Sequence, residues 1–151
     1  MVQIKTILCA LDFSEVSPKV ASYAKSLAEV CGAKVIVLYV APSLTQYVEF
    51  HVQASYIDDF VTGIVHGATD TMNTYLKEYF KDVPAEGKVV TGYAAEEIVN
   101  AATEVKADMI VLGTHGRRGL DKFLFGSVAE KVIKMSPVPV LSMRPDPKPE
   151  A

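Results

Sequence analysis

Residues 4–12 read IKTILCALD, and this stretch sets the expected fold. The run is short and mostly apolar, which is typical of a strand buried inside a parallel sheet. The residues after it repeat their apolar side chains every three or four positions, as an amphipathic helix does. Asp12 or Ser14 can cap the start of this helix, and Gly32 ends it. Residues 34–40, KVIVLYV, are a second apolar run, so the opening of the chain predicts a strand–helix–strand unit.

The same alternation continues along the rest of the chain. Residues 41–56 show no clear period, and Pro42 opposes a helix there. Further strands are expected over residues 88–91, 108–112 and 138–143, and further helices over residues 57–80, 94–105 and 127–135. The alternation implies an α/β fold, an open, doubly wound, five-stranded parallel sheet flanked by four helices. Pro139 has no N–H to donate, so the last strand is expected at a sheet edge.

Length and composition indicate a single globular domain. The chain has 151 residues and half of them are hydrophobic, which excludes intrinsic disorder. We expect residues 1–144 to form the domain and the proline-rich residues 145–151 to be a disordered tail. A net charge of −3 argues against nucleic acid as a partner, and no apolar run is long enough to span a membrane. No secretion signal is recognisable, so we expect a cytoplasmic protein with Cys9 and Cys31 as buried thiols.

Two of the expected strands end in residues that suggest a binding site. Asp12 follows the first strand, and a loop with four of the nine glycines, residues 113–126, follows the fourth. In doubly wound sheets, ligands bind at the carboxyl ends of the strands, where the winding direction reverses. If these two strands are neighbours, Asp12 and the glycine loop lie on the same crevice.

The glycine loop combines three features of a phosphate site. Gly113 and Gly116 let the backbone approach a ligand closely and adopt positive φ angles. Gly126 and Ser127 begin a helix, whose free N–H groups favour an anion. The loop carries a local charge of +2, from Arg117, Arg118 and Lys122 against Asp121. These features predict a phosphate cradle of backbone amides, and the alternative is a glycine-rich connector with solvated arginines.

The spacing of this loop resembles that of a known family. Gly113, Gly116, Gly126 and Ser127 form the pattern Gly-x2-Gly-x9-Gly-Ser, which resembles the motif of the ATP-binding branch of the universal stress proteins. The resemblance extends to ILCALDFSEVS at residues 7–17 and to GSVAEKVIKMSPVPVL at residues 126–141. It implies a Rossmann-like fold of the adenine nucleotide alpha hydrolase type, with ATP and Mg²⁺ as ligands.

The resemblance also implies roles for individual residues on the first two strands. Asp12 is expected to hold the ribose hydroxyls or a magnesium ion, and its alternative role is that of a helix cap. The backbone of Val40 is expected to recognise the adenine edge. Ala10 and Leu11 are expected to give only apolar contact.

The remaining implied contacts lie in the loop and at the start of the helix after it. They are Gly113, Thr114, Gly116, Arg117, Gly126, Ser127 and Val128. The first two glycines would line the ribose and phosphates, and the last three residues would present backbone amides to the phosphates, with the serine hydroxyl. Arg117 and His115 either contact the ligand or are solvated.

No residue is assigned to catalysis. His51, His66 and His115 are widely separated and lack the spacing of a zinc site. Ser14 and Ser17 have no evident partners for a nucleophilic triad. No general base stands out beside the expected γ-phosphate, so fast hydrolysis is not expected.

The sequence leaves three classes of function open. The first is an ATP-dependent sensor or switch in the stress response, with slow or no hydrolysis. The second is a nucleotide-independent interaction or chaperone-like module that uses its dimer surface and residues 41–56. The third is an ATP-consuming enzyme, for which 151 residues leave little room for further catalytic elements.

We also expect a homodimer, built through the strand over residues 138–143. An edge strand offers unpaired backbone groups that a second copy can pair with. Members of the family that this chain resembles commonly pair in this way. The protein partners that would read the nucleotide state are not identifiable from the sequence.

Overall fold

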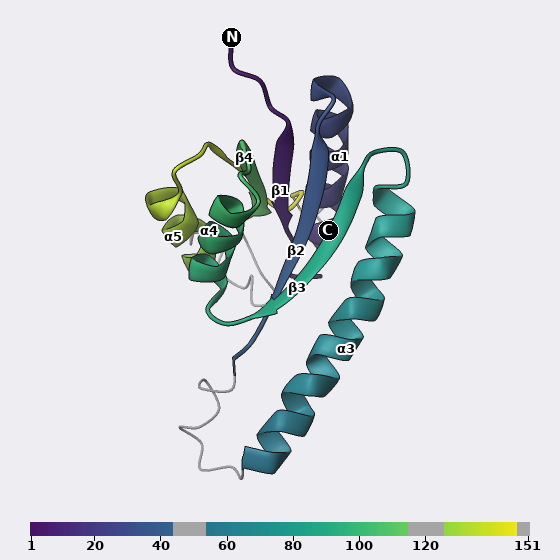
Figure 1. Ribbon diagram of the computed structural model, residues 1–151, viewed down its shortest axis with the longest axis vertical. Coiled ribbons are helices and arrows are strands. Elements are labelled where there is room, and N and C mark those ends of the chain that lie inside the picture. Colours follow the sequence, from purple (N-terminus) through teal and green to yellow (C-terminus); the bar gives the residue numbers. More distant parts are fainter. Residues whose placement is uncertain (44–53, 115–125, 148–151) are drawn as a thin grey trace.

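The computed structural model describes residues 1–43, 54–114 and 126–147, and it confirms the expected α/β order (Figure 1). Its elements, in chain order, are β1 (Thr6–Ala10), α1 (Ser17–Cys31), β2 (Lys34–Ala41), α3 (Ala54–Tyr79), β3 (Ala85–Thr91), α4 (Ala94–Glu104), β4 (Met109–Gly113), α5 (Ser127–Met135) and β5 (Val140–Met143). None of the helices in the described ranges is long and apolar enough to cross a membrane.

The five strands form one parallel sheet in the order β3-β2-β1-β4-β5. β1 is central, because Cys9 pairs with Val37 of β2 on one side and with Val111 of β4 on the other. The chain winds outward through β2 and β3, and then crosses back to β4 and β5. The expected neighbours, β1 and β4, therefore lie side by side at the point where the winding reverses.

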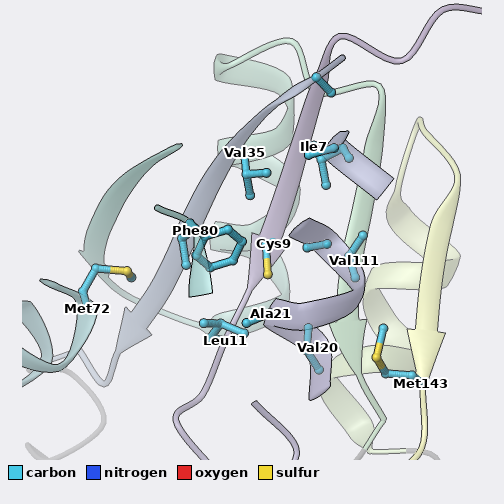
Figure 2. Close-up of a cluster of buried hydrophobic side chains, with 14 of the residues drawn as sticks. Ile7, Cys9, Leu11, Val20, Ala21, Val35, Met72, Phe80, Val111 and Met143 are labelled. Atoms are coloured by element: carbon cyan, nitrogen blue, oxygen red, sulfur yellow. The ribbon is translucent and has the colours of Figure 1, made fainter. Parts of the chain in front are cut away.

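Two apolar layers hold helices against the sheet. Because side chains alternate along a strand, Ile7 and Cys9 point to the face covered by α1 and α3, while Leu8 points to the face covered by α4 and α5. Figure 2 shows the first layer, in which Phe80 lies close to Cys9. β1, β2 and β4 are covered on both faces, as their continuous apolar runs predict.

Several boundaries differ from the expected ones. β3 begins at Ala85 rather than at residue 88, so Gly87 lies within the strand and not in the preceding turn. A Cβ at Gly87 would stand 2.5 Å from Met72 Cγ, so the glycine lets α3 pack closely on this strand. The expectation of two buried thiols is wrong for Cys31, which is exposed in the last turn of α1, while Cys9 is buried.

β5 lies at the sheet edge, as expected from Pro139. The proline carbonyl accepts a hydrogen bond from the Ile110 N–H at 2.9 Å, so the residue joins the ladder through the one group that it can offer. Of the C-terminal residues, Asp146 pairs with Lys19 at 2.7 Å, and residues 148–151 lie outside the described ranges.

Asp108 fastens β1 to β4 at the amino ends of the strands. Its Oδ2 accepts hydrogen bonds from the Lys5 N–H at 2.8 Å and the Thr6 N–H at 3.0 Å, and its own N–H donates to Thr6 O at 2.8 Å. These two backbone donors lower the pKa of the Asp108 carboxyl below its usual range. The hydrogen bonds of Asp108 thus align β1 and β4 at the ends opposite to the candidate site.

Gly113, the last residue of β4, lies under the first turn of α1. A Cβ at this position would stand 2.9 Å from Val16 Cγ1 and 3.4 Å from Val20 Cγ2. Gly113 does not have the positive φ angle that the sequence suggested, since the described glycines with such angles are Gly32 and Gly92. The glycine is needed here for close packing of a helix on a strand.

We predict that Asp108→Asn destabilises the protein at neutral pH and that the difference from the wild type shrinks in acid. A carboxyl whose pKa is lowered on folding contributes stability above its ordinary value of 3.8, and this contribution is lost as the pH falls through the folded-state pKa. Urea unfolding of both proteins, from neutral pH into acid, measures the difference between their free energies of unfolding. Asp70→Asn, at an exposed position on α3, is the control. A difference that stays unchanged in acid would contradict the prediction.

We predict that Gly113→Ala destabilises the protein by about 1–3 kcal/mol, because the added methyl overpacks the contact with Val16. The matched control is Gly63→Ala in α3, where a Cβ has no atom within 4 Å. That change should stabilise the helix by up to about 1 kcal/mol. The urea midpoints of the two variants should move in opposite directions, and a shared direction would show that Gly113 is not needed for packing.

Candidate functional site

The candidate site lies at the carboxyl ends of β1 and β4. Asp12 follows β1 by two residues, and Thr114 follows β4 directly. Since these strands pair through Leu8 with Ile110 and Cys9 with Val111, the two strand ends meet at the same edge of the sheet. β1 and β4 are therefore neighbours, which is the condition for Asp12 and the first residues of the glycine loop to share a crevice.

Asp12 organises the turn between β1 and α1. Its Oδ1 accepts hydrogen bonds from the Ser14 N–H at 2.9 Å and from the Ser17 hydroxyl at 3.1 Å. The expectation that Asp12 or Ser14 caps α1 is wrong, because the N-cap is Val16 and makes no side-chain cap bond. Both of these bonds end on Oδ1, and Oδ2 takes part in neither of them.

Phe13 holds this turn in an unusual backbone conformation. Its φ angle is 59°, in the left-handed region that costs a residue with a large side chain about 1–3 kcal/mol. The Phe13 ring stacks on Tyr39 at a centroid distance of 4.7 Å and meets Tyr75 at 5.2 Å. These contacts offset the backbone cost and fix the direction in which the chain leaves Asp12.

Tyr75 extends the same network to α3. Partial burial raises the pKa of the Tyr75 hydroxyl, and its interactions with Tyr79 and Asp12 raise it further. The contact of the Tyr75 ring with Phe13, at a centroid distance of 5.2 Å, brings α3 to the turn that follows Asp12.

The main chain of Val40 faces the gap beyond the end of β1. Leu38 O accepts from the Leu11 N–H at 2.9 Å, on the β1 side, and Ala41 O accepts from the Gly92 N–H at 3.0 Å, on the β3 side. Because main-chain groups alternate sides along a strand, those of Val40 point to the β1 side. The last residue of β1, Ala10, is already paired with Leu38, so Val40 extends past it.

The apolar residues expected near the ligand lie in different environments. Leu11 is 5% exposed, and its side chain belongs to the core under α1 and α3. Ala10 is partly buried and packs towards α4 and α5. The Leu11 side chain is therefore part of the core, while Ala10 keeps some exposed surface.

The ends of the glycine loop are fastened to each other and to β5. The Gly126 N–H donates to Thr114 O at 2.6 Å, and the Thr114 N–H donates to Met143 O at 2.9 Å. Thr114 is 3% exposed, and its hydroxyl also donates to Met143 O at 3.3 Å. His115, Gly116 and Arg117 lie outside the described residues.

The start of α5 provides the amides expected at the phosphates. Gly126 uses its own N–H to close the loop, and its carbonyl accepts the first helical bond, from the Glu130 N–H at 3.1 Å. The N–H groups of Ser127 and Val128 lie in the first turn, where a helix has no carbonyl of its own to pair with them. Both residues are exposed. The positive end of the helix dipole adds to the attraction for an anion.

The sequence missed the residues that support Asp12. The sequence presents Ser17 only as a nucleophile without partners, and it gives Phe13 and Tyr75 no place in the site. The signal for Ser17 was its spacing of five residues from Asp12, across the boundary between a strand and a helix. The aromatic contacts had no sequence signal, since Phe13 and Tyr75 are 62 positions apart.

Comparison with known proteins assigns the chain and its fold to one family. A sequence model of the Universal stress protein family matches residues 3–144. The universal stress protein MJ0531 of Methanocaldococcus jannaschii is 34% identical over 142 residues, which cover 93% of this chain and 82% of that protein. MJ0577 of the same organism is 30% identical over 162 residues, covering 95% and 96%.

Solved structures agree with the sequence comparison. The structure of MJ0577 matches with a TM-score of 0.83, covering 97% of this chain and all of the other. A universal stress protein of Archaeoglobus fulgidus in complex with dAMP matches with a TM-score of 0.62 at 22% identity, covering 94% and 98%, and shares the fold. By its sequence match over nearly its whole length, this chain belongs to the universal stress protein family.

Proposed function

We propose that this protein binds ATP, with Mg²⁺, at the crevice between β1 and β4, and that it acts as a nucleotide-dependent sensor or switch in the stress response. The observation that carries the proposal is the meeting of three groups at one sheet edge. These groups are the outward main chain of Val40, the Asp12 carboxylate and the first-turn amides of α5.

Each of these groups matches one part of the ligand. Main-chain N–H and C=O groups, as at Val40, suit the donor and acceptor edge of adenine. The Asp12 carboxylate suits the ribose hydroxyls or a magnesium ion, because hard oxygen ligands are those that Mg²⁺ prefers. The amides of Ser127 and Val128, at a helix N-terminus, suit the phosphates. The related Archaeoglobus protein was solved with an adenine nucleotide, dAMP, which supports the class of ligand.

The proposed role is binding with slow or no hydrolysis. Asp12 already accepts two hydrogen bonds on Oδ1, and its other oxygen is assigned to the ligand, so it is not available as a general base. Binding would favour one arrangement of residues 113–126, or the dimer, and partner proteins would recognise that state. Both cysteines are free thiols, which supports a reducing, cytoplasmic location.

We predict saturable binding of ATP by the wild type below millimolar concentration, and its loss in Gly126→Asp. Gly126 has φ −49°, which any residue can adopt, and aspartate is a good N-cap, so the variant should fold. Its negative charge at the phosphate position should weaken binding on the order of 100-fold or more. Isothermal titration calorimetry measures the affinities.

Gly126→Asn is the matched control, because asparagine has nearly the same shape and capping ability without the charge. It should bind ATP much more tightly than Gly126→Asp does. No saturable binding by the wild type would remove the proposal. Equal affinities of the two variants would show that the phosphates lie elsewhere.

We propose further that the protein is a homodimer that pairs through β5. Pro139 O and Met143 O both accept hydrogen bonds from the β4 side, from Ile110 and Thr114. Because main-chain groups alternate along the strand, those of Val140 and Ser142 point to the open edge, as a paired second copy requires.

We predict that Ser142→Pro converts the dimer to a monomer. Proline removes the outward N–H at this position but leaves the bonds to β4, and it is tolerated on an edge strand. Ser142→Ala, which keeps the N–H, should remain dimeric. Sedimentation velocity at micromolar concentration distinguishes the two states, and a monomeric wild type would contradict the proposal.

A further inference from the structure

Ser17 is a buried polar residue at the start of α1. It is 1% exposed, whereas the Asp12 side chain that it contacts is partly exposed at the candidate site. Among the described residues, the buried polar side chains are those of Thr6, Ser17 and Thr114. A buried hydroxyl is costly unless it is paired, so the hydrogen bond that pairs the Ser17 hydroxyl matters for the structure around it.

The Ser17 hydroxyl does not serve the helix. α1 has Val16 as its N-cap, and the Ser17 N–H is already satisfied by Ser14 O at 3.0 Å. The hydroxyl instead donates to Asp12 Oδ1 at 3.1 Å, and a hydrogen bond to a charged acceptor is stronger than one between neutral groups. The side chain therefore acts on Asp12, five residues before it.

The bond from Ser17 restricts how the Asp12 carboxylate can turn. The Ser14 N–H reaches the same oxygen at 2.9 Å, so two donors from different directions hold Oδ1. Rotation of the carboxylate would break both bonds. With Oδ1 held in this way, Oδ2 has one preferred direction.

The turn between Asp12 and Ser17 packs against an aromatic cluster through Phe13. The Tyr75 ring of α3 meets that of Phe13 at a centroid distance of 5.2 Å. Phe13 lies between Asp12 and Ser14, and its stacking on Tyr39 fixes the turn that contains all three. The orientation of Asp12 thus depends on two helices and two strands, not only on its own turn.

We infer that Ser17 is a positioning residue for the ligand carboxylate: it fixes Asp12 through Oδ1 so that Oδ2 faces the ribose or the magnesium ion. This inference rests on the proposed function, because it gives Asp12 a ligand to hold. Supporting residues of this kind typically change ligand affinity by roughly 10- to 100-fold when they are removed.

The test is a double-mutant cycle on ATP affinity, with Ser17→Ala, Asp12→Asn and the double variant. Asp12→Asn keeps a side-chain oxygen that accepts from Ser14 and Ser17, so the turn should remain folded, but the charge is lost. Ser17→Ala alone should weaken ATP binding roughly tenfold. In the Asp12→Asn background, the same change should have little further effect, because Ser17 acts only through the carboxylate.

Two further variants separate positioning from general structure. Ser22→Ala, at an exposed position on the same helix, should bind ATP like the wild type. Ser17→Thr, which keeps the hydroxyl, should recover affinity relative to Ser17→Ala. Urea unfolding of every variant shows whether affinity changes simply follow stability.

The outcomes distinguish the two proposals. A wild type that does not bind ATP overturns the proposed function and this inference together. A wild type that binds, with an unchanged Ser17→Ala, overturns the inference alone. An equal loss of ATP affinity from Ser17→Ala in the wild type and in the Asp12→Asn variant also overturns the inference. Ser17 would then act on the fold and not through Asp12.

Discussion

The pairing of β1 with β4 is the constraint on which the rest of the structure depends. β1 is hydrogen-bonded on both sides, to β2 and to β4, and the chain reverses its winding between them. Neither neighbour stops where β1 stops: β2 continues to Ala41, past the pairing of Ala10 with Leu38. Because of this difference in length, the main-chain groups of Val40 that point to the β1 side lie past the last paired residue of β1. Asp108 aligns the same two strands from the opposite end.

The glycines of the loop motif have separate physical duties. Gly113 removes a side chain that would collide with Val16, so α1 can lie close to β4. Gly126 gives its N–H to Thr114 and thereby joins the two ends of the loop. Among the residues of this motif that the structure describes, the amides left for an anion are those of the residues after Gly126. Part of the Gly-x2-Gly-x9-Gly-Ser motif therefore serves the fold: Gly113 allows helix packing and Gly126 joins the ends of the loop.

The turn after β1 combines a strained residue, Phe13, with the Asp12 carboxylate of the candidate site. The left-handed backbone of Phe13 would not persist alone, but its ring stacks on Tyr39 and makes a tilted contact with Tyr75. The same turn brings the Ser17 hydroxyl to Asp12. The aromatic contacts between α3, β2 and this turn thus stabilise the geometry of a polar group at the edge of the sheet. Local strain of this kind is commonly found where a site must be preorganised.

The sequence by itself determined the order of the elements and the two strand ends at which the candidate site is proposed. Alternating apolar runs and helical periods are local properties, so they could be read from residues 4–12 and from the segments that follow. The sequence predicts the boundaries of the elements less well. Gly87 is a residue type found in turns, but it lies within β3, where Met72 packs against it. Only the tertiary structure decided that β1 and β4 are neighbours and that Gly113 serves packing. It also decided that Ser17 bonds to Asp12 and that Tyr75 packs on Phe13. These facts depend on contacts between residues distant in the chain, whose spacing leaves no periodic signal.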